Sequence, residues 1–193
     1  MGTRELLLEA GIIAFDSAGF GATTVAALCA AAGVSNDSFF HCFGTKEGLA
    51  AAIYLDALCA YHAHLVQALD ASPDAATGIA ALVQAHLDWV MQERRAARFL
   101  FEQARAEWLP SIHARQQAEN QTFAARIDAW RGPLVQQNSL CPLSPWLFFR
   151  QLIGPAPMLC RAWLSGTNDA DPRQHAASLI DCAQRALLVS SHP

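Results

Sequence analysis

The chain has 193 residues, of which 53% are hydrophobic and 16% are charged, and its formal net charge is −4. This composition excludes intrinsic disorder, and the negative charge argues against a strongly basic nucleic-acid binder or a polybasic membrane binder. No apolar run reaches about 18 residues, and no signal-peptide pattern follows Met1. We therefore expect a cytoplasmic protein with no membrane-spanning segment.

Apolar residues recur at intervals of three and four along the whole chain, which is typical of α-helices. Caps and breakers divide this pattern into nine predicted helices. Their approximate ranges are 3–18, 25–32, 36–43, 46–69, 72–94, 96–108, 110–130, 145–164 and 172–189.

Local chemistry marks the boundaries of these helices. Gly33 permits the left-handed cap that ends the second helix, and Ser35 and Thr45 cap the third and fourth. The Ser-Pro-Asp sequence at 72–74 supplies a cap, a first-turn proline and a first-turn acid for the fifth helix. Pro155 and Pro157 predict a kink in the eighth helix.

Two short helices, 25–32 and 36–43, form a candidate helix-turn-helix. The first is too short to be stable alone, so it must pack against neighbours. Leu28, Val34 and Phe39 fall where such a motif needs apolar contacts. This spacing presents the second helix to the DNA major groove, although a plain helical hairpin has the same spacing.

Three segments carry a family resemblance: GFGATTV at 19–25, AAGVS at 31–35 and FFHCFGTKEGL at 39–49. Over residues 3–50 the chain resembles the TetR/AcrR family of bacterial transcriptional regulators, and beyond them it does so only in length and helical layout. The resemblance implies an all-α, nine-helix fold with a three-helix DNA-binding head, residues 1–48, and a ligand-binding and dimerisation body, residues 49–193. It also implies a homodimer, formed by the last two helices, that binds a palindromic operator as a repressor and releases it when a small-molecule effector binds.

The matching positions offer hydroxyl, amide and cationic groups for DNA. Thr24 heads the second helix, where a phosphate can bind, and Asp37 can accept a hydrogen bond from a cytosine amino group. Phe40 stands where the family usually has tyrosine, and can touch a thymine methyl group. The predicted DNA-binding residues are Thr24, Ser35, Asn36, Asp37, Ser38, Phe40, His41, Thr45 and Lys46.

The head is nevertheless acidic. Residues 1–50 contain two basic residues, Arg4 and Lys46, against five acidic residues, a net charge of −3. Because counterion release supplies much of the affinity for DNA, we expect weak non-specific binding and a shallow salt dependence. The alternative function is a helical ligand- or protein-binding module of the same fold with weak or lost DNA binding.

The body offers candidates for an effector pocket. Aromatic side chains suit a small, largely apolar compound, and buried amides need partners that a ligand can supply. The predicted pocket residues are His86, Trp89, Phe101, Arg105, Gln116, Asn120 and Phe123. A hydrogen-bonded core histidine, a solvent-facing start of the seventh helix and solvated charges on the sixth remain the competing interpretations.

The last two predicted helices carry more large apolar groups than a surface helix needs, which favours a four-helix dimer interface. The predicted interface residues are Phe149, Leu152, Trp163, Ile180, Ala183 and Leu187. A core of the body is the competing interpretation.

Other functions have little support. No H-E-x-x-H, G-x-S-x-G or P-loop motif occurs, so we expect no enzyme. The six cysteines form no C-x-x-C pair, and His62 and His64 would point in different directions on a helix, so we expect no metal and no cofactor. Cys42, on the second helix of the helix-turn-helix, is a candidate redox switch.

Overall fold

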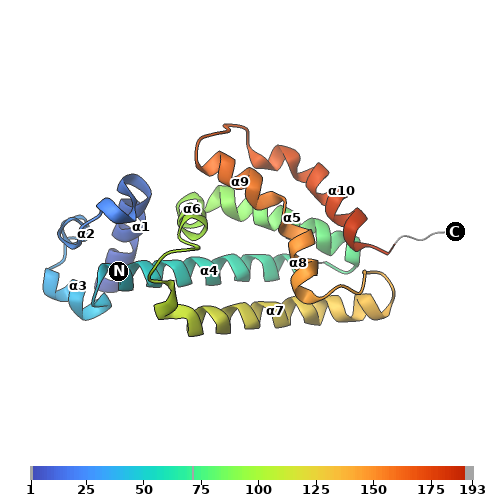
Figure 1. The fold of residues 1–193 in the computed structure, drawn as a ribbon, viewed down its shortest axis with the longest axis horizontal. Helices are drawn as coiled ribbons and strands as arrows, with labels where there is room; N and C mark the ends of the chain where they lie inside the picture. Colours follow the sequence, from blue (N-terminus) through green and yellow to red (C-terminus); the bar gives the residue numbers. More distant parts are fainter. Residues whose placement is uncertain (1, 71, 190–193) are drawn as a thin grey trace. The chain divides into compact units, whose positions relative to one another are not determined.

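The computed structural model describes residues 2–70 and 72–189, and this part of the chain folds into α-helices without a strand (Figure 1). The prediction of an all-α fold is confirmed, although ten α-helices and two short 3-10 helices stand in place of the nine expected. The helices are α1 (Thr3–Ala22), α2 (Val25–Ala32), α3 (Asn36–Phe43), α4 (Lys46–Asp70), α5 (Ala75–Gln92), α6 (Arg94–Glu102), η1 (Leu109–Ile112), α7 (His113–Gln136), α8 (Pro145–Ile153), α9 (Ala156–Leu164), η2 (Pro172–His175) and α10 (Ala176–Leu187).

The short helices of the head begin and end where the sequence predicted. The Thr24 hydroxyl caps α2 by accepting a hydrogen bond from the Ala27 amide at 3.2 Å, and Gly33 ends the helix with φ 65°. The Ser35 hydroxyl caps α3 in the same way. Gly19 has φ 79° and kinks α1, which continues beyond the predicted end to Ala22.

Predictions in the middle of the chain were less accurate. Helix α5 begins at Ala75 because Asp74 caps it, its carboxylate accepting a hydrogen bond from the Thr77 amide at 2.9 Å. The Ser72 hydroxyl instead donates to the Ala68 carbonyl at 2.9 Å, at the end of α4. Helix α6 ends at Glu102 rather than at residue 108.

Prolines also act differently from the prediction. Helix α7 passes through Pro133 to Gln136, and the Gln137 amide donates to the Pro133 carbonyl at 2.9 Å. A proline removes one amide donor, and the residues after it keep theirs. The predicted eighth helix is divided into α8 and α9, and Gly154 and Pro155 between them keep right-handed helical φ/ψ.

The chain divides into two compact units. Unit 1 contains residues 1–59 and 93–116. Its α6 packs on α1, where Asp16 pairs with Arg98 at 3.4 Å and with Arg95 at 3.6 Å. Gly11 of α1 lies so close to α4 that an added Cβ would meet the Ile53 side chain at 2.8 Å.

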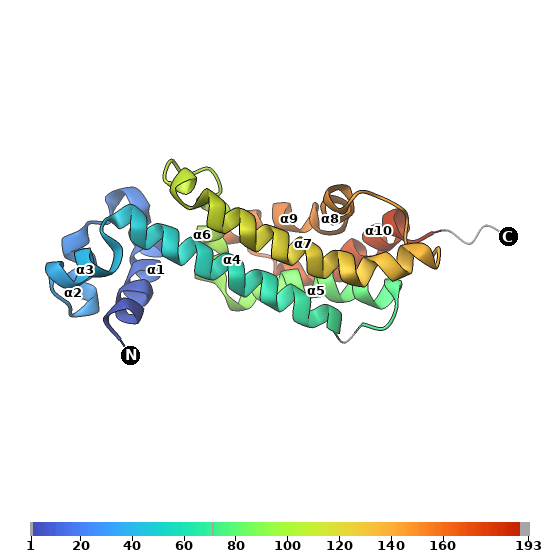
Figure 2. The same ribbon diagram turned by 90° about the horizontal axis from the view of Figure 1, so that it is seen from below.

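Unit 2 contains residues 60–92 and 117–193. Helix α5 lies against α8, α9 and α10, as Figure 1 shows for α9 and α10, and α7 runs beside the second part of α4 (Figure 2). The largest fully buried side chains of this unit are Leu65, Ile79, Leu82, Leu87, Leu140, Phe148, Leu152 and Leu187.

Among the described helices, α4 alone is long and apolar enough to cross a membrane by length and composition. Most of its apolar window is buried within the protein. That burial is typical of a core helix, so the feature is weak evidence for a membrane span.

Candidate nucleic-acid interface and the polar core of the body

Helix α3 presents a compact exposed face. Four of its side chains are exposed: those of Asn36 and Asp37, and, one helical turn later, those of Phe40 and His41. The side chain of Phe39, on the opposite side of the helix, is fully buried. The Phe40 side chain is 53% exposed, which is unusual for a large aromatic residue among polar neighbours. This face combines polar groups that can reach base edges with a ring that can touch a thymine methyl group.

The hydroxyl groups that were predicted to bind DNA cap the N-termini of helices in this structure. Ser35 Oγ accepts a hydrogen bond from the Ser38 amide at 3.1 Å, and the two serine hydroxyls lie 2.9 Å apart. Thr45 Oγ1 accepts from the Gly48 amide at 2.9 Å at the start of α4, as Thr24 does for α2. Each of these residues therefore fixes the geometry of the head, whatever contact it makes with DNA.

Lys46 is bound inside unit 1. Its ammonium donates hydrogen bonds to the carbonyl oxygens of Phe20 at 2.8 Å and Thr23 at 2.9 Å, and lies 4.4 Å from the centre of the Phe20 ring. Two of its three N–H donors are thus used by the end of α1. The residue fastens α4 to α1, a role that the sequence analysis missed.

Thr23 was also missed by the sequence analysis. Its side chain is buried, and its hydroxyl donates to the Gly19 carbonyl at 2.8 Å. This bond stabilises the kinked end of α1. The carbonyl groups of Phe20 and of Thr23 itself accept the hydrogen bonds from Lys46. The other basic residue of the head, Arg4, is exposed and lies over the Phe43 ring, and Cys42 is half-buried.

Three polar side chains form a chain inside unit 2. The Tyr61 hydroxyl lies 2.8 Å from His86 Nδ1, and Cys160 Sγ lies 3.7 Å from His86 Nε2. Burial lowers the pKa of His86 to about 4 and raises the pKa of Cys160 to about 12. His86 is therefore neutral at pH 7, with a hydrogen-bond partner at each ring nitrogen, and has the features of a structural core histidine.

A second polar pair lies between α4 and α7. His62 Nδ1 is 2.8 Å from a Glu119 carboxylate oxygen, and the His62 ring stacks on Phe123 with centroids 4.1 Å apart. Burial lowers the pKa of His62, and this outweighs the opposing effect of Glu119. We infer that neutral His62 donates its Nδ1–H to the carboxylate.

The predicted pocket residues do not form one group within either unit. Phe101, Arg105 and Gln116 belong to unit 1, where Gln116 donates to the Tyr54 hydroxyl at 3.2 Å. The others belong to unit 2, where Trp89 and Phe123 are buried. Arg105 and Asn120 are exposed, because the inward face of α7 contains Glu119, four residues before Phe123, rather than Asn120.

Half of the predicted dimer residues are buried within the subunit. Leu152, Ala183 and Leu187 are 2%, 3% and 0% exposed. They pack in the core of unit 2, which is the competing interpretation given for these helices. Phe149, Trp163 and Ile180 are half-buried.

Other apolar side chains of unit 2 are open to solvent. Trp146 and Leu147 of α8 are 68% and 37% exposed, and Met158 of α9 is 75% exposed. The sequence analysis did not single out Leu147 or Met158, because helical periodicity alone does not show which side of an apolar helix faces the core.

The head matches a known family model. Residues 7–53 match the model described as bacterial regulatory proteins, tetR family. The matched range contains α2, α3 and most of α1, and reaches into α4. No curated protein matches the chain.

The whole chain shares its fold with solved structures. A regulatory protein of the tetR family from Rhodococcus RHA1 superposes with a TM-score of 0.79 at 21% identity, covering 99% of this chain and 100% of that one. A TetR family transcription regulator from Marinobacter aquaeolei VT8 gives 0.77 at 19% identity, covering 97% and 96%. FadR from Bacillus subtilis, solved with stearoyl-CoA, gives 0.79 at 13% identity, covering 98% and 99%.

Proposed function

We propose that this chain, which belongs to the TetR family of bacterial transcriptional regulators, is a homodimeric repressor that binds a palindromic operator and releases it when a small, largely apolar effector binds. The observation that carries the proposal is the exposed face of α3. TetR-family regulators are generally not enzymes, and we propose none here. The site of action would be the cytoplasm, where the operator lies.

The α3 face supports direct contact with bases. Asn36 and Asp37 lie in the first turn of a capped helix, and Phe40 and His41 follow one turn later. In helix-turn-helix proteins the first residues of the second helix reach base edges in the major groove. We propose that these four side chains contact bases and that Ser35, Ser38, Thr24, Thr45 and Lys46 hold the helices and meet phosphates.

Exposed apolar groups on α8 and α9 support a dimer. Trp146, Leu147 and Met158 are large side chains open to solvent in the single subunit, and a second copy of the chain would cover them. A two-fold interface uses the same surface on both subunits. We propose that this surface, with the half-buried Phe149, replaces the buried residues first predicted for the interface.

The effector would bind in unit 2. FadR from Bacillus subtilis, which has the same fold, was solved with stearoyl-CoA, a ligand with a long apolar chain. Unit 2 has an apolar interior in which His62 and Glu119 form a polar pair, and the Glu119 side chain keeps 24% exposure. We propose that the apolar part of an effector packs near Phe123 and that its polar end meets this pair.

A second candidate function rests on the charge of the head. The net charge of residues 1–50 is −3, and the ammonium of Lys46 is already bound by two carbonyl oxygens. Few phosphates can then be neutralised. The alternative is a helical ligand- or protein-binding module of the TetR fold with weak or lost DNA binding.

The deciding experiment is selection of genomic DNA fragments by the purified full-length protein, followed by a salt titration on the best fragment. We expect a palindromic site with a shallow salt slope. Asn36→Ala should weaken binding to that site about tenfold, as loss of a base contact does. Gln121→Ala, which changes an exposed amide on α7, is the matched control and should bind as the wild type does.

Two results would count against the repressor. One is a folded dimer that enriches no fragment at low salt, which would favour the binding module. The other is equal loss of affinity in Asn36→Ala and Gln121→Ala, which would show that α3 is not the contact surface.

A further inference from the structure

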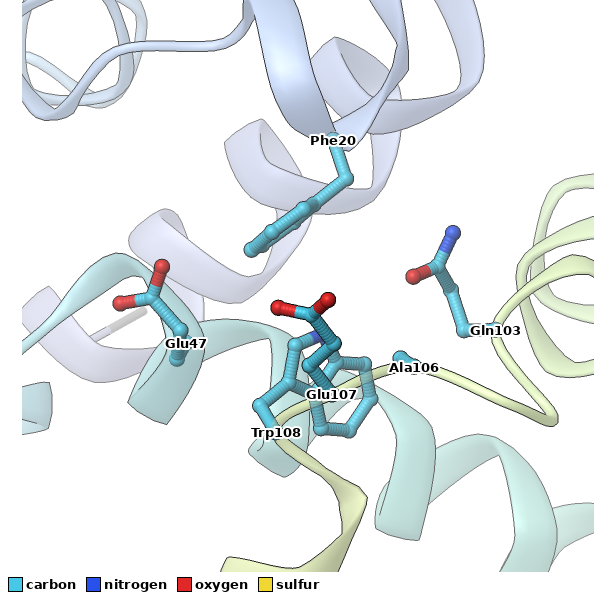
Figure 3. Close-up of a pocket in the computed structure, with 6 residues that line it drawn as sticks. All are labelled: Phe20, Glu47, Gln103, Ala106, Glu107 and Trp108. Atoms are coloured by element: carbon cyan, nitrogen blue, oxygen red, sulfur yellow. The ribbon is translucent and has the colours of Figure 1, made fainter.

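Unit 1 contains a cleft that the proposed repressor function does not use. Its volume is about 430 Å³, and it is formed by the end of α1, the first turn of α4 and the segment that follows α6. Figure 3 shows the six lining residues, which are Phe20, Glu47, Gln103, Ala106, Glu107 and Trp108. The volume lies within the range of small-molecule sites, about 300–1,000 Å³.

The wall of the cleft contains an unsatisfied donor. Trp108 is more than nine-tenths buried, and its indole Nε1 has no hydrogen-bond partner among the described residues. In Figure 3 the indole nitrogen lies on the side of the ring nearest to Phe20 and Glu107. Buried N–H groups are nearly always paired, because an unpaired one loses its bonds to water without replacement. A ligand with an acceptor atom would supply the missing bond.

The rim of the cleft carries negative charge. Glu47 and Glu107 are exposed, and no ion pair in the described part of the chain involves either carboxylate. The nearby base Lys46 is turned to carbonyl oxygens of α1. Two unpaired carboxylates beside aromatic rings attract a cation.

The chemistry favours an organic cation over a metal ion. No group of three or more metal-ligating side chains occurs in the residues that the structure describes. The rings of Phe20 and Trp108 lie 6.4 Å apart at an angle of 50°, so a flat group can contact both. We propose that the cleft binds a small aromatic cation that also carries a hydrogen-bond acceptor for the Trp108 N–H.

Binding would also affect the fastening of the head. Phe20 lines the cleft, and its carbonyl and ring both contact Lys46. A cation at the same ring competes with the Lys46 ammonium for it. A change in operator affinity on binding rests on the proposed repressor function, whereas binding itself does not.

The test uses the full-length protein and para-methoxybenzamidine, which combines an aromatic ring, an amidinium charge and an ether acceptor. The uncharged para-methoxybenzamide is the matched control ligand. Calorimetry measures affinity, and the indole N–H resonance of Trp108, assigned by its loss in Trp108→Phe, reports the position. We expect the amidine to bind at least about tenfold more tightly than the amide and to shift that resonance.

Variants of the two glutamates at the rim test whether their carboxylates bind the amidinium group. Glu47→Gln and Glu107→Gln should each weaken amidine binding about fivefold, and the double variant about twenty-fivefold. Glu9→Gln, an exposed carboxylate of α1 outside the cleft, should leave the affinity unchanged. All these sites are exposed, so the variants should fold, and circular dichroism checks this.

The proposal is overturned if the amide binds as tightly as the amidine, if the Trp108 resonance does not move, or if Glu9→Gln weakens binding as much as Glu107→Gln. None of these readouts contains DNA, so they are independent of the repressor proposal. With operator DNA present, Glu107→Gln should need about fivefold more amidine than the wild type for the same change in operator affinity.

Discussion

Polar groups have opposite uses in the DNA-binding head and in unit 2. In the head, Ser35 and Thr24 cap helices at the surface, and half-buried Lys46 ties two helices together through carbonyl oxygens. In unit 2, His86 and His62 are buried and neutral. The head therefore gains order from side-chain bonds to backbone groups at or near its surface, whereas unit 2 depends on close packing and on uncharged histidines.

The largest expected contrast concerns packing. A Cβ at Gly78 of α5 would overlap the Trp130 ring, while a Cβ at Gly21 of α1 would have nothing within 4 Å. Gly78→Ala should lower the free energy of unfolding by about 2–3 kcal/mol, since a close-packed core resists added atoms. Gly21→Ala should raise it by about 0.4–1 kcal/mol. Urea denaturation measures both, and equal effects would remove the contrast.

The second contrast concerns pH. Burial lowers the pKa of His86 to about 4, whereas the unfolded chain binds this proton near pH 6.5. The stability linked to His86 is therefore fully present above about pH 6.5 and is lost as the pH falls towards 4.

We expect this linkage to cost about 2 kcal/mol between pH 7 and pH 5. His86→Leu, although less stable at pH 7, should lose less stability over the same interval. Gln121→Leu, at an exposed position of α7 that carries no titratable group, is the matched control and should keep the wild-type pH dependence. An unchanged slope in His86→Leu would show that His86 is not the group responsible.

The smallest change in the free energy of unfolding is expected for the contact between Lys46 and the end of α1. Lys46→Met keeps the aliphatic stem but removes two charge-assisted hydrogen bonds, and should lower the free energy of unfolding by about 1–2 kcal/mol. Arg4→Met removes the other, exposed cation of the head and should cost less than about 0.5 kcal/mol. Thermal denaturation of both variants measures these losses of stability. Equal losses in the two variants would mean that the hydrogen bonds from Lys46 to the carbonyl groups do not stabilise the protein.

The sequence was sufficient for the helix-turn-helix. Thr24, Gly33 and Ser35 each bond to a backbone group three residues away, so α2 and α3 could be predicted to the residue. The same local reasoning failed at α5, where Ser72 and Asp74 both suit a cap, because Asp74 caps α5 while the Ser72 hydroxyl bonds to the end of α4. Helix α6 ends early, and residues 103–108 form turns before η1, in which Trp108 is buried.

The site residues were harder to predict, because the sequence does not show which side chains are buried within the subunit. A helical stripe shows that one face is apolar, but it does not show what covers that face. Leu152, Ala183 and Leu187 are thus core residues. A rotation of about 100° separates consecutive helix positions, and this decided that Glu119 rather than Asn120 faces His62.

The amino-acid sequence by itself therefore determined the all-α class, the head with its caps and its net negative charge, because these follow from neighbouring residues or from counting. The tertiary structure alone decided the fastening by Lys46, the neutral histidines of unit 2 and the cleft at Trp108. Each of these brings together residues more than twenty positions apart, and no short-range pattern encodes such contacts.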